Sequence, residues 1–362
     1  MEATKAAVRA EVIGSLLRPR VLKDTIALLL RGAVSRSEAD QMLAREVERV
    51  IARQEAIGFK VVTDGEFGRS SWFGFFFEGM EGFRLAPAHF QFKDASDQAF
   101  SWQTCAAAGP IVRRGPIALP EYERARRYAR EALVKITLPA PSAFHFFRLE
   151  EAVDPAAYPD RARYFEDLVK VYSTELKELA AAGCRYVQFD EVPLAMLCDP
   201  SVRQQAASRG ADPCALLDSY IGLLRHICAE RPPGMRLGLH LCRGNFRGRW
   251  MAAGAMSPLP RRFSTACQSM SSCSSTTVRG RAISRRCAWC RRAKSSCWVS
   301  CPPNSSVWKT QTTFCAASRR QGTSCPSSGR VVDPARLCQR RGRQCPHRGR
   351  SMGQARADCP HR

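Results

Sequence analysis

The two side chains best suited to chemistry in this sequence are His240 and Cys242, which stand two positions apart in the apolar stretch MRLGLHLCRGN. In a β-strand, residues two positions apart point to the same face, so an imidazole and a thiol would lie side by side. Nitrogen and sulfur are the ligands that Zn²⁺ prefers in a tetrahedral site. Two ligands do not complete such a site, and a buried histidine beside a buried cysteine is the more common structural outcome. The pair therefore indicates a metal site only together with donors from elsewhere in the chain.

Acidic residues follow two other apolar stretches. VVTDGE ends in Asp64 and Glu66, and YVQFDE ends in Asp190 and Glu191. The C-terminal ends of parallel strands lie on one side of a sheet, which is where barrel enzymes place their active sites. We therefore expect these carboxylates to lie near the imidazole and the thiol, although acidic residues can also simply mark the exit of a strand.

A helical segment is expected before each of the three stretches. Apolar residues recur at helical spacing in residues 37–58, 164–182 and 213–230, and the strands that follow are predicted at 59–63, 184–191 and 235–245. Ser37 and Asp40 have the spacing of a capping box for the first helix. Repeated helix, tight turn and apolar strand predict an α/β fold built on a parallel sheet.

Four motifs resemble the cobalamin-independent methionine synthase family, specifically its C-terminal catalytic barrel. They are IGSLLRP (13–19), VVTDGEFGRSSW (61–72), YVQFDEVPLAMLCDP (186–200) and HLCRGNFRGRW (240–250), in the family's order. The resemblance implies a (β/α)₈ TIM-type barrel and methyl transfer from a methylated folate to homocysteine, as in 5-methyltetrahydropteroyltriglutamate–homocysteine S-methyltransferase of methionine biosynthesis. Related members alkylate other small thiols, and these motifs do not separate the two activities.

The resemblance also implies roles for individual residues. His240 and Cys242 match two of the family's four zinc ligands. Ser15 matches the serine that holds the substrate carboxylate, and Glu66 and Asp190 match acids that receive its ammonium group. A free thiol with a pKa of about 8.5 is mostly protonated at neutral pH, whereas a zinc-bound thiol is a nucleophilic thiolate. The expected cofactor is Zn²⁺, the expected methyl donor is a methylated folate, and the expected partner is a small-molecule thiol.

Composition divides the chain near residue 255. Residues 1–255 carry 35 basic and 31 acidic side chains, whereas residues 256–362 carry 21 basic and only two acidic ones. The second part also holds 11 of the 17 cysteines, and the helical and strand periodicity stops where it begins. We therefore expect a barrel-like domain of about six βα units over 1–255, followed by a non-native Arg/Ser/Cys-rich tail that is disordered over 256–362.

Two interpretations of the tail remain open. Cys287, Cys290, Cys297 and Cys301 have a loose zinc-binding spacing, and with so many basic residues they could form an arm that binds nucleic acid. The second interpretation, which we favour, is that the tail is the product of a frameshift. Enrichment in Arg, Ser, Cys and Pro with almost no acidic residue is typical of a GC-rich gene read in the wrong frame.

The frameshift interpretation can be examined with synonymous codons. Codons for residues 256–284, read from the third base of each, allow EPVAEALFNGLSVDVFLLEYDGARAGDF. Codons for residues 296–315, read in the same shifted frame, also allow a string that resembles the family. From residue 342 onward such a string is obtained when reading starts at the second base of each codon. These strings resemble the family's C-terminal third, so we expect two single-base losses, near residues 254–256 and near residue 329.

The frameshift predicts a barrel without its last two strands. The family's third zinc ligand, a glutamate, lies in the recovered LLEYD, where the present chain has serines. The fourth ligand is a cysteine, and the codons around residues 334–337 permit a histidine but not a cysteine, so we do not expect that cysteine in the parent gene either. We therefore expect unpaired strand edges that favour aggregation, no stoichiometric zinc, and an inactive enzyme.

Several protein classes are excluded by the sequence pattern. No apolar run approaches the roughly 20 residues of a membrane span, and the first residues lack the apolar core of a secretory signal. A cytoplasmic protein without a dense disulfide framework is expected. The cysteines outside the HLC motif in the first part are expected to be buried structural residues: Cys105, Cys184, Cys198, Cys214 and Cys228.

Overall fold

The computed structural model describes residues 11–253 and three short strand segments beyond them, 271–274, 277–278 and 281–282. Contacts divide the chain into two units, Met1–Asn304 and Ser305–Arg362, and every described residue belongs to the first. The tail cysteines with zinc-like spacing and most of the predicted frameshifted segment lie outside the described residues.

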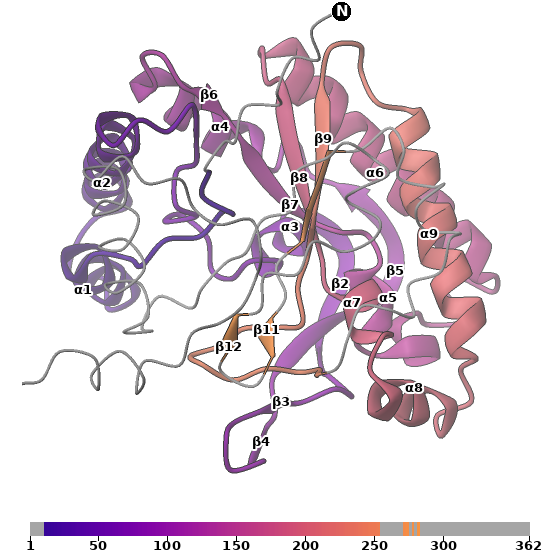
Figure 1. The fold of residues 1–362 in the computed structure, drawn as a ribbon. Coiled ribbons are helices and arrows are strands. Elements are labelled where there is room, and N and C mark those ends of the chain that lie inside the picture. Colours follow the sequence, from indigo (N-terminus) through magenta and orange to yellow (C-terminus); the bar gives the residue numbers. More distant parts are fainter. Residues whose placement is uncertain (1–10, 254–270, 275–276, 279–280, 283–362) are drawn as a thin grey trace, which may run out of the picture. The chain divides into compact units, whose positions relative to one another are not determined.

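A parallel sheet forms the centre of the first unit (Figure 1). Its strands are β1 (Val61–Val62), β6 (Leu133–Val134) with β7 (Ile136–Pro139), β8 (Tyr186–Glu191), β9 (Arg236–Leu241) and β10 (Ser271–Ser274). β1 pairs with β6, and the order β7, β8, β9, β10 follows on. Only Lys135 separates β6 from β7, and its N–H donates to the Val62 carbonyl oxygen at 2.9 Å. The two hydrogen-bonded sheets are therefore continuous at that residue.

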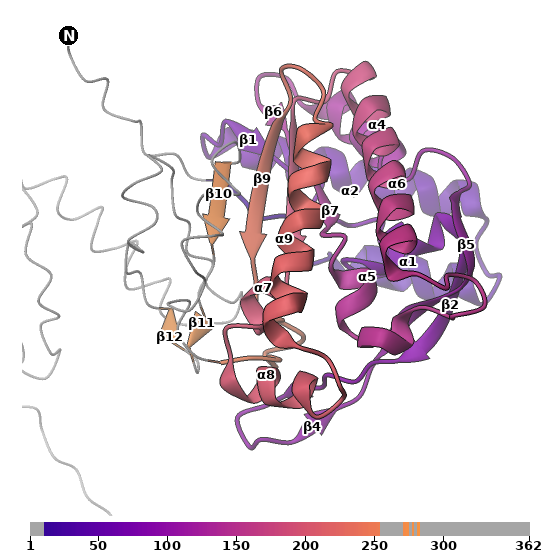
Figure 2. The same ribbon diagram turned by 90° about the vertical axis from the view of Figure 1, so that its right-hand side faces the viewer.

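Helices cover the outer face of this sheet in chain order (Figure 2). In the described part, α1 packs on α2, α2 on α4, α4 on α6, and α6 on α9. The helices are α1 (Arg20–Leu30), α2 (Arg36–Ala56), α3 (Gly74–Glu78), α4 (Leu119–Tyr128), α5 (Ala143–Phe146), α6 (Arg161–Ala181), α7 (Pro193–Met196), α8 (Pro200–Ala207) and α9 (Pro213–Ala229), with a 3₁₀ turn η1 at Leu149–Ala152. This arrangement confirms the α/β class.

Local sequence determines where the helices begin. Asp199 and Asp212 cap α8 and α9 with their side chains, and each is followed by a proline in the first turn, where a missing N–H costs nothing. The capping box of α2 consists of Ser35 and Glu38, so the prediction of Ser37 was wrong by two positions. The S-x-x-E pattern at Ser35 permits both reciprocal hydrogen bonds.

An antiparallel hairpin interrupts the alternation of strands and helices after α3. β2 (Met80–Pro87) pairs with β5 (Gln103–Arg113), and β3 (Phe92–Lys93) pairs with β4 (Ala99–Phe100) between them. The N–H of Lys93 donates to the carbonyl oxygen of Trp250 and the N–H of Trp250 donates back, at 2.7 and 2.9 Å. The hairpin is therefore joined to the segment that follows β9.

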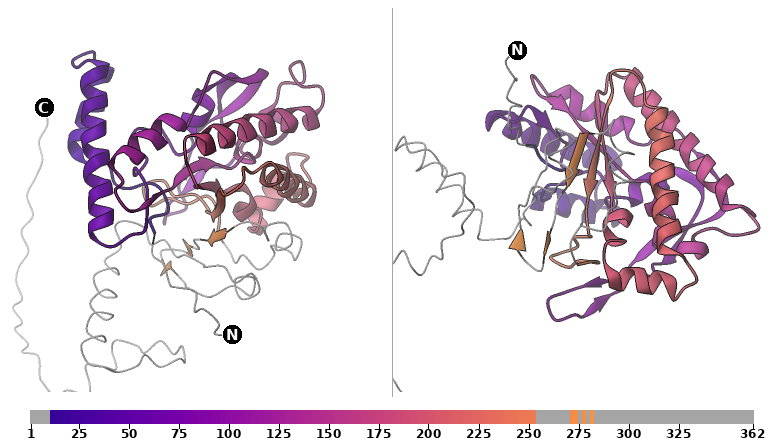
Figure 3. Two further views of the ribbon diagram at one scale, coloured as in Figure 1. Left: turned by 90° about the horizontal axis from the view of Figure 1, so that it is seen from above. Right: turned by 45° about the vertical axis from the view of Figure 1, so that its right-hand side comes forward.

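Three segments of the tail, which was expected to be disordered, form strands. β10 runs parallel to β9, and β11 (Thr277–Val278) pairs with β12 (Arg281–Ala282) (Figure 3). Strand pairing uses backbone N–H and C=O groups, and the free edge of β9 offers a row of them. A serine-rich segment can therefore pair there even though its sequence has no alternating apolar pattern.

The described residues do not form a closed barrel. β1 and β10 are the end strands of the continuous sheet, and no pairing joins them within residues 11–253 or the three later segments. The fold is therefore an open part of the expected TIM-type architecture.

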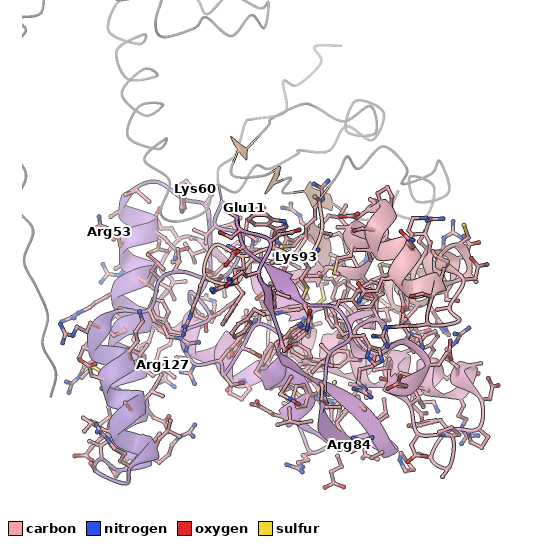
Figure 4. All side chains as sticks on the ribbon, turned by 90° about the horizontal axis from the view of Figure 1, so that it is seen from below. Glu11, Arg53, Lys60, Arg84, Lys93 and Arg127 are labelled. Atoms are coloured by element: carbon pink, nitrogen blue, oxygen red, sulfur yellow. The ribbon has the colours of Figure 1, made fainter. Side chains whose placement is uncertain are left out.

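Basic side chains labelled in Figure 4 lie on the exposed surface of the fold: Arg53, Lys60, Arg84, Lys93 and Arg127.

Candidate active site at the C-terminal ends of the parallel strands

The segment that carries the IGS motif is held against one face of the sheet by three polar side chains. Lys135 Nζ and Gln188 Nε2 donate to the carbonyl oxygens of residues 12 and 13, at 2.6 and 2.9 Å. The Thr63 hydroxyl donates to the carbonyl oxygen of residue 14 at 2.8 Å. All three donors are buried. These bonds satisfy the backbone of a segment that is not part of a regular strand.

The segment that carries Ser15 is joined to the turn that carries Glu66. Leu16 N–H donates to the Gly65 carbonyl oxygen at 3.0 Å, and Gly14 lies against the Glu66 carboxyl group. A Cβ atom on residue 14 would lie 2.4 Å from Glu66 Oε1 and 2.9 Å from Thr137 Cγ2. Ser15 itself is exposed, so its hydroxyl is accessible to a ligand.

Replacing Gly14 with alanine should displace the Glu66 carboxyl group. The added methyl group overlaps Glu66 Oε1 and the Thr137 methyl group, and both neighbours are buried. We expect the free energy of unfolding in urea to fall by about 1–3 kcal/mol, as for other overpacked sites. Gly222→Ala is the control, because Gly222 lies exposed in α9 with open space around it. The control should gain up to about 1 kcal/mol from helix propensity, and equal effects of the two variants would contradict the packing argument.

Glu66 is held in an unusual backbone conformation. Its φ is 58°, in the left-handed region that is sparsely populated by residues other than glycine. Asp64 Oδ1 accepts the Glu66 N–H at 2.9 Å, and Arg18 Nη2 donates to the Glu66 carbonyl oxygen at 3.2 Å. The Thr137 hydroxyl donates to Glu66 Oε1 at 2.8 Å. Strain of this kind persists where surrounding contacts enforce it and is typical of ligand-binding turns.

Asp64 is buried among charged side chains. Burial and the neighbouring charge of Glu121 raise its pKa to about 7, although Arg69 acts in the opposite direction. Its Oδ2 atom has no hydrogen-bond partner among the described residues. Asp64 therefore carries a proton in much of the population at neutral pH, which reduces the negative charge next to Glu66.

Asp190 lies at the end of β8, on the same face as Gln188. Gln188 Nε2 donates to Asp190 Oδ1 at 2.8 Å, and both side chains are buried. Burial and the charge of Glu66 raise the pKa of Asp190 to about 7. The structure thus brings Glu66 and Asp190 close enough to repel each other.

The side chain of Glu191 points to the opposite face of β8 from that of Asp190. Its Oε2 accepts the Ser142 hydroxyl at 2.6 Å and its Oε1 accepts the Leu194 N–H at 2.8 Å. Burial raises its pKa to about 7. Glu191 therefore joins β8 to the following α7 and does not belong to the group around Glu66.

His240 and Cys242 lie next to Asp190 on the neighbouring strand. His240 is the direct partner of Asp190 in the parallel β8–β9 register, whereas β9 ends at Leu241 and Cys242 follows it. Burial, with the positive charge of Lys135, lowers the pKa of His240 to about 3, so its imidazole is neutral. Burial raises the pKa of the half-buried Cys242 thiol to about 11, and the charge of Asp190 adds to the shift.

The described residues do not fit a zinc ion. Within residues 11–253, no group of three or more His, Cys, Asp or Glu side chains is arranged to hold a metal. Zinc sites of the catalytic kind use three protein ligands and an open position. His240 and Cys242 offer two, so we derive no chemical step through a metal for this chain.

Three of the remaining five cysteines of this part are buried as the sequence predicted. Cys105, Cys184 and Cys198 are buried and Cys228 is half-buried, whereas Cys214 is exposed and was wrongly predicted as buried. Cys214 is the second residue of α9. All of them are free thiols.

The sequence motifs did not indicate the residues that hold the site in place. Arg69 and Thr137 contact the Glu66 carboxyl group, and Lys135 and Gln188 hold the IGS segment. A signal for two of them was present, because Lys135 and Gln188 interrupt apolar strands that are buried on both faces. Such polar residues need partners inside the fold.

None of the helices within the described part of the chain combines the length and apolar character needed to cross a membrane.

Comparison with known proteins agrees with the four sequence motifs. The family model for the cobalamin-independent synthase catalytic domain matches residues 9–247. The protein YxjH of Bacillus subtilis, which is uncharacterized, is 32% identical over 252 residues, covering 69% of this chain and 65% of that protein. A methionine synthase from Pyrococcus furiosus is 26% identical over 235 residues, covering 65% of this chain and 61% of that protein.

A solved structure from Listeria monocytogenes, described as a vitamin-B12-independent methionine synthase, has a similar fold. Its TM-score is 0.51 at 23% sequence identity, and the match covers 66% of this chain and 68% of that one. The matched part of the present chain spans somewhat less than two thirds of the length of YxjH and of the Pyrococcus protein. On the match over residues 9–247, this chain belongs to the cobalamin-independent synthase catalytic-domain family.

Proposed function

We propose that this chain binds a small amino-acid thiol, homocysteine in the first instance, at Ser15, Glu66 and Asp190. The observation that carries the proposal is the pair of buried carboxyl groups, Glu66 and Asp190, placed close enough to repel each other beside the exposed Ser15. An ammonium group between the two carboxyl groups would offset that repulsion. A hydroxyl group at Ser15 can donate a hydrogen bond to the ligand carboxylate.

The position of Cys242 and His240 indicates where the ligand sulfur would lie. His240 lies directly opposite Asp190 in the β8–β9 register, and Cys242 follows two positions later. An amino acid held by its ammonium group at Asp190 would direct its side chain along this edge of the sheet. Fixing a reactant at both ends in this way is a major source of rate acceleration in group transfer.

By descent, the chain resembles a homocysteine methyltransferase that uses zinc to activate the thiol and a methylated folate as methyl donor. In this chain the described donors number two, so we propose that the present form is impaired in methyl transfer. The frameshift hypothesis explains the deficit. β10 ends at Ser274, which pairs with Leu241, and the recovered reading places the glutamate of LLEYD at this point of the sequence.

Two alternatives are less well supported. A related enzyme that alkylates another small thiol would use the same residues, and no described contact distinguishes it. A nucleic-acid-binding tail would depend on residues that lie outside the described part of the chain. A cytoplasmic location agrees with the homocysteine methyltransferase and with the related enzyme that alkylates another thiol.

Calorimetric titration of the full chain with L-homocysteine tests the binding proposal. Asp190→Asn should weaken binding by more than about tenfold, because a buried charged contact to the ammonium group is lost. Asp24→Asn is the control, since Asp24 lies exposed on α1 in an ion pair with Arg20. Absence of homocysteine binding by the unaltered chain, or equal binding by the two variants, would overturn the proposal.

A further inference from the structure

Thr137, on β7, contacts the Glu66 carboxyl group, and no motif singled it out. Its hydroxyl lies 2.8 Å from Glu66 Oε1, and the side chain is buried. We propose that Thr137 is a positioning residue, which turns the Glu66 carboxyl group so that Oε2 faces the ammonium group of a bound amino acid. This inference rests on the proposed function and adds a residue to it.

The direction of the hydrogen bond follows from the second contact of the hydroxyl. Arg69 Nη1 donates to Thr137 Oγ1 at 2.9 Å. A guanidinium group has only donors, so it uses a lone pair of the hydroxyl oxygen. The single hydroxyl proton is then available to Glu66 Oε1. Arg69 therefore determines which way the threonine hydroxyl points.

Arg69 is itself held from three sides. Its Nε donates to both carboxyl oxygens of Glu121 at 3.1 and 3.0 Å, and its Nη2 donates to Glu121 Oε2 at 2.7 Å and to the Thr137 carbonyl oxygen at 2.8 Å. The guanidinium carbon lies 3.9 Å from the centre of the Phe75 ring. These contacts occupy the N–H groups of the guanidinium group and one of its faces, so they fix the orientation of Arg69. Arg69 in turn orients the Thr137 hydroxyl, which binds Glu66.

The contacts of the Glu66 carboxyl group are all on one oxygen. Among the described residues, Thr137 donates to Oε1, Arg69 Nη1 lies 3.5 Å from Oε1, and the backbone of Gly14 packs against the same atom. Oε2 takes no part in these contacts. An oxygen that lacks a donor among the described residues is the one suited to accept an N–H of the ligand, with the direction set from the opposite side of the carboxyl group.

The test compares two ligands that differ only in the amino group. L-homocysteine and 4-sulfanylbutanoate are titrated into the full chain by calorimetry. The dissociation constant of 4-sulfanylbutanoate divided by that of L-homocysteine measures recognition of the ammonium group. Thr137→Val removes the hydroxyl but keeps the shape, and it should reduce the ratio by about tenfold. Thr137→Ser keeps the hydroxyl and should stay within about threefold of the unaltered chain. A general structural defect would weaken both ligands together and leave the ratio unchanged.

The outcomes separate the two proposals. If the unaltered chain binds both ligands equally, the ammonium site of the proposed function is wrong. If it discriminates between them and Thr137→Val retains the same ratio, the positioning role of Thr137 is wrong. Should Thr137→Val not fold, Thr137→Ala and Thr137→Ser provide the same comparison, because they too differ by one hydroxyl group. Equal ratios in that pair would overturn the inference.

Discussion

Restoring the reading frame after Ala253 should convert this chain from a protein without stoichiometric zinc into one that retains zinc and methylates homocysteine. Within residues 11–253 the present chain offers two zinc donors, His240 and Cys242, and the restored sequence adds the glutamate of LLEYD at the end of the neighbouring strand β10. Three protein ligands suffice for a catalytic zinc site. Elemental analysis of both purified proteins measures the metal, and a thiol-methylation assay with a methylated folate measures the activity.

The role of the thiol is tested within the restored protein. Cys242→Ala should lower the methylation rate by more than about 100-fold, the upper end of what the loss of an outer-shell partner costs a metal site. Cys228→Ala is the matched control, because it removes a half-buried thiol from α9. Unchanged turnover in Cys242→Ala, or after exhaustive chelation, would show that the chemistry does not use a metal-bound sulfur. One tight zinc ion per chain in the unrestored protein would contradict the frameshift explanation.

Arg69→Met should lower the free energy of unfolding by about 3–5 kcal/mol. The Arg69 side chain is 1% exposed and neutralises Glu121, whose side chain is 11% exposed, at 2.7 Å. Burial lowers the pKa of Arg69, but the charges of Glu121 and Glu66 outweigh that effect and raise it, so the guanidinium remains charged. Its removal leaves Glu121 and Glu66 buried without their shared cation. Urea unfolding of the purified chain measures the change.

Two further variants identify the cause. Arg69→Met combined with Glu121→Met should recover part of the lost stability, because no unpaired charge remains at that position. Arg36→Met removes an exposed partner of Asp40, with side chains 79% and 50% exposed, and should cost less than about 1 kcal/mol. If Arg69→Met costs no more than Arg36→Met, the buried ion pair does not stabilise the fold.

The helices and central strands could be predicted because their signals are local. The helices α6 and α9 were predicted to within three residues at each end, since the apolar spacing and the capping residues lie within the elements themselves. The first strand was predicted over 59–63 and is limited to Val61–Val62. Strand ends depend on where the partner strand stops, and that information lies elsewhere in the chain.

The membership of the site was predictable only in part. Glu66, Asp190, His240 and Cys242 stand at strand ends, and the parallel sheet places them on one side as expected. Their individual roles remain predictions. The resemblance to the family singled out Asp190 and not Glu191, and the contacts to Gln188 and Ser142 show that these two side chains leave opposite faces of the strand.

By itself, the sequence determined the family, the alternation of helices and strands, and the break in composition near residue 255, because each is carried by neighbouring residues. The tertiary structure decided which polar groups support Glu66. Arg69, Glu121 and Thr137 come from three separate segments, and only folding brings them into hydrogen-bonding distance. It also decided that a serine-rich segment pairs with β9, since strand pairing uses the backbone groups at the edge of β9.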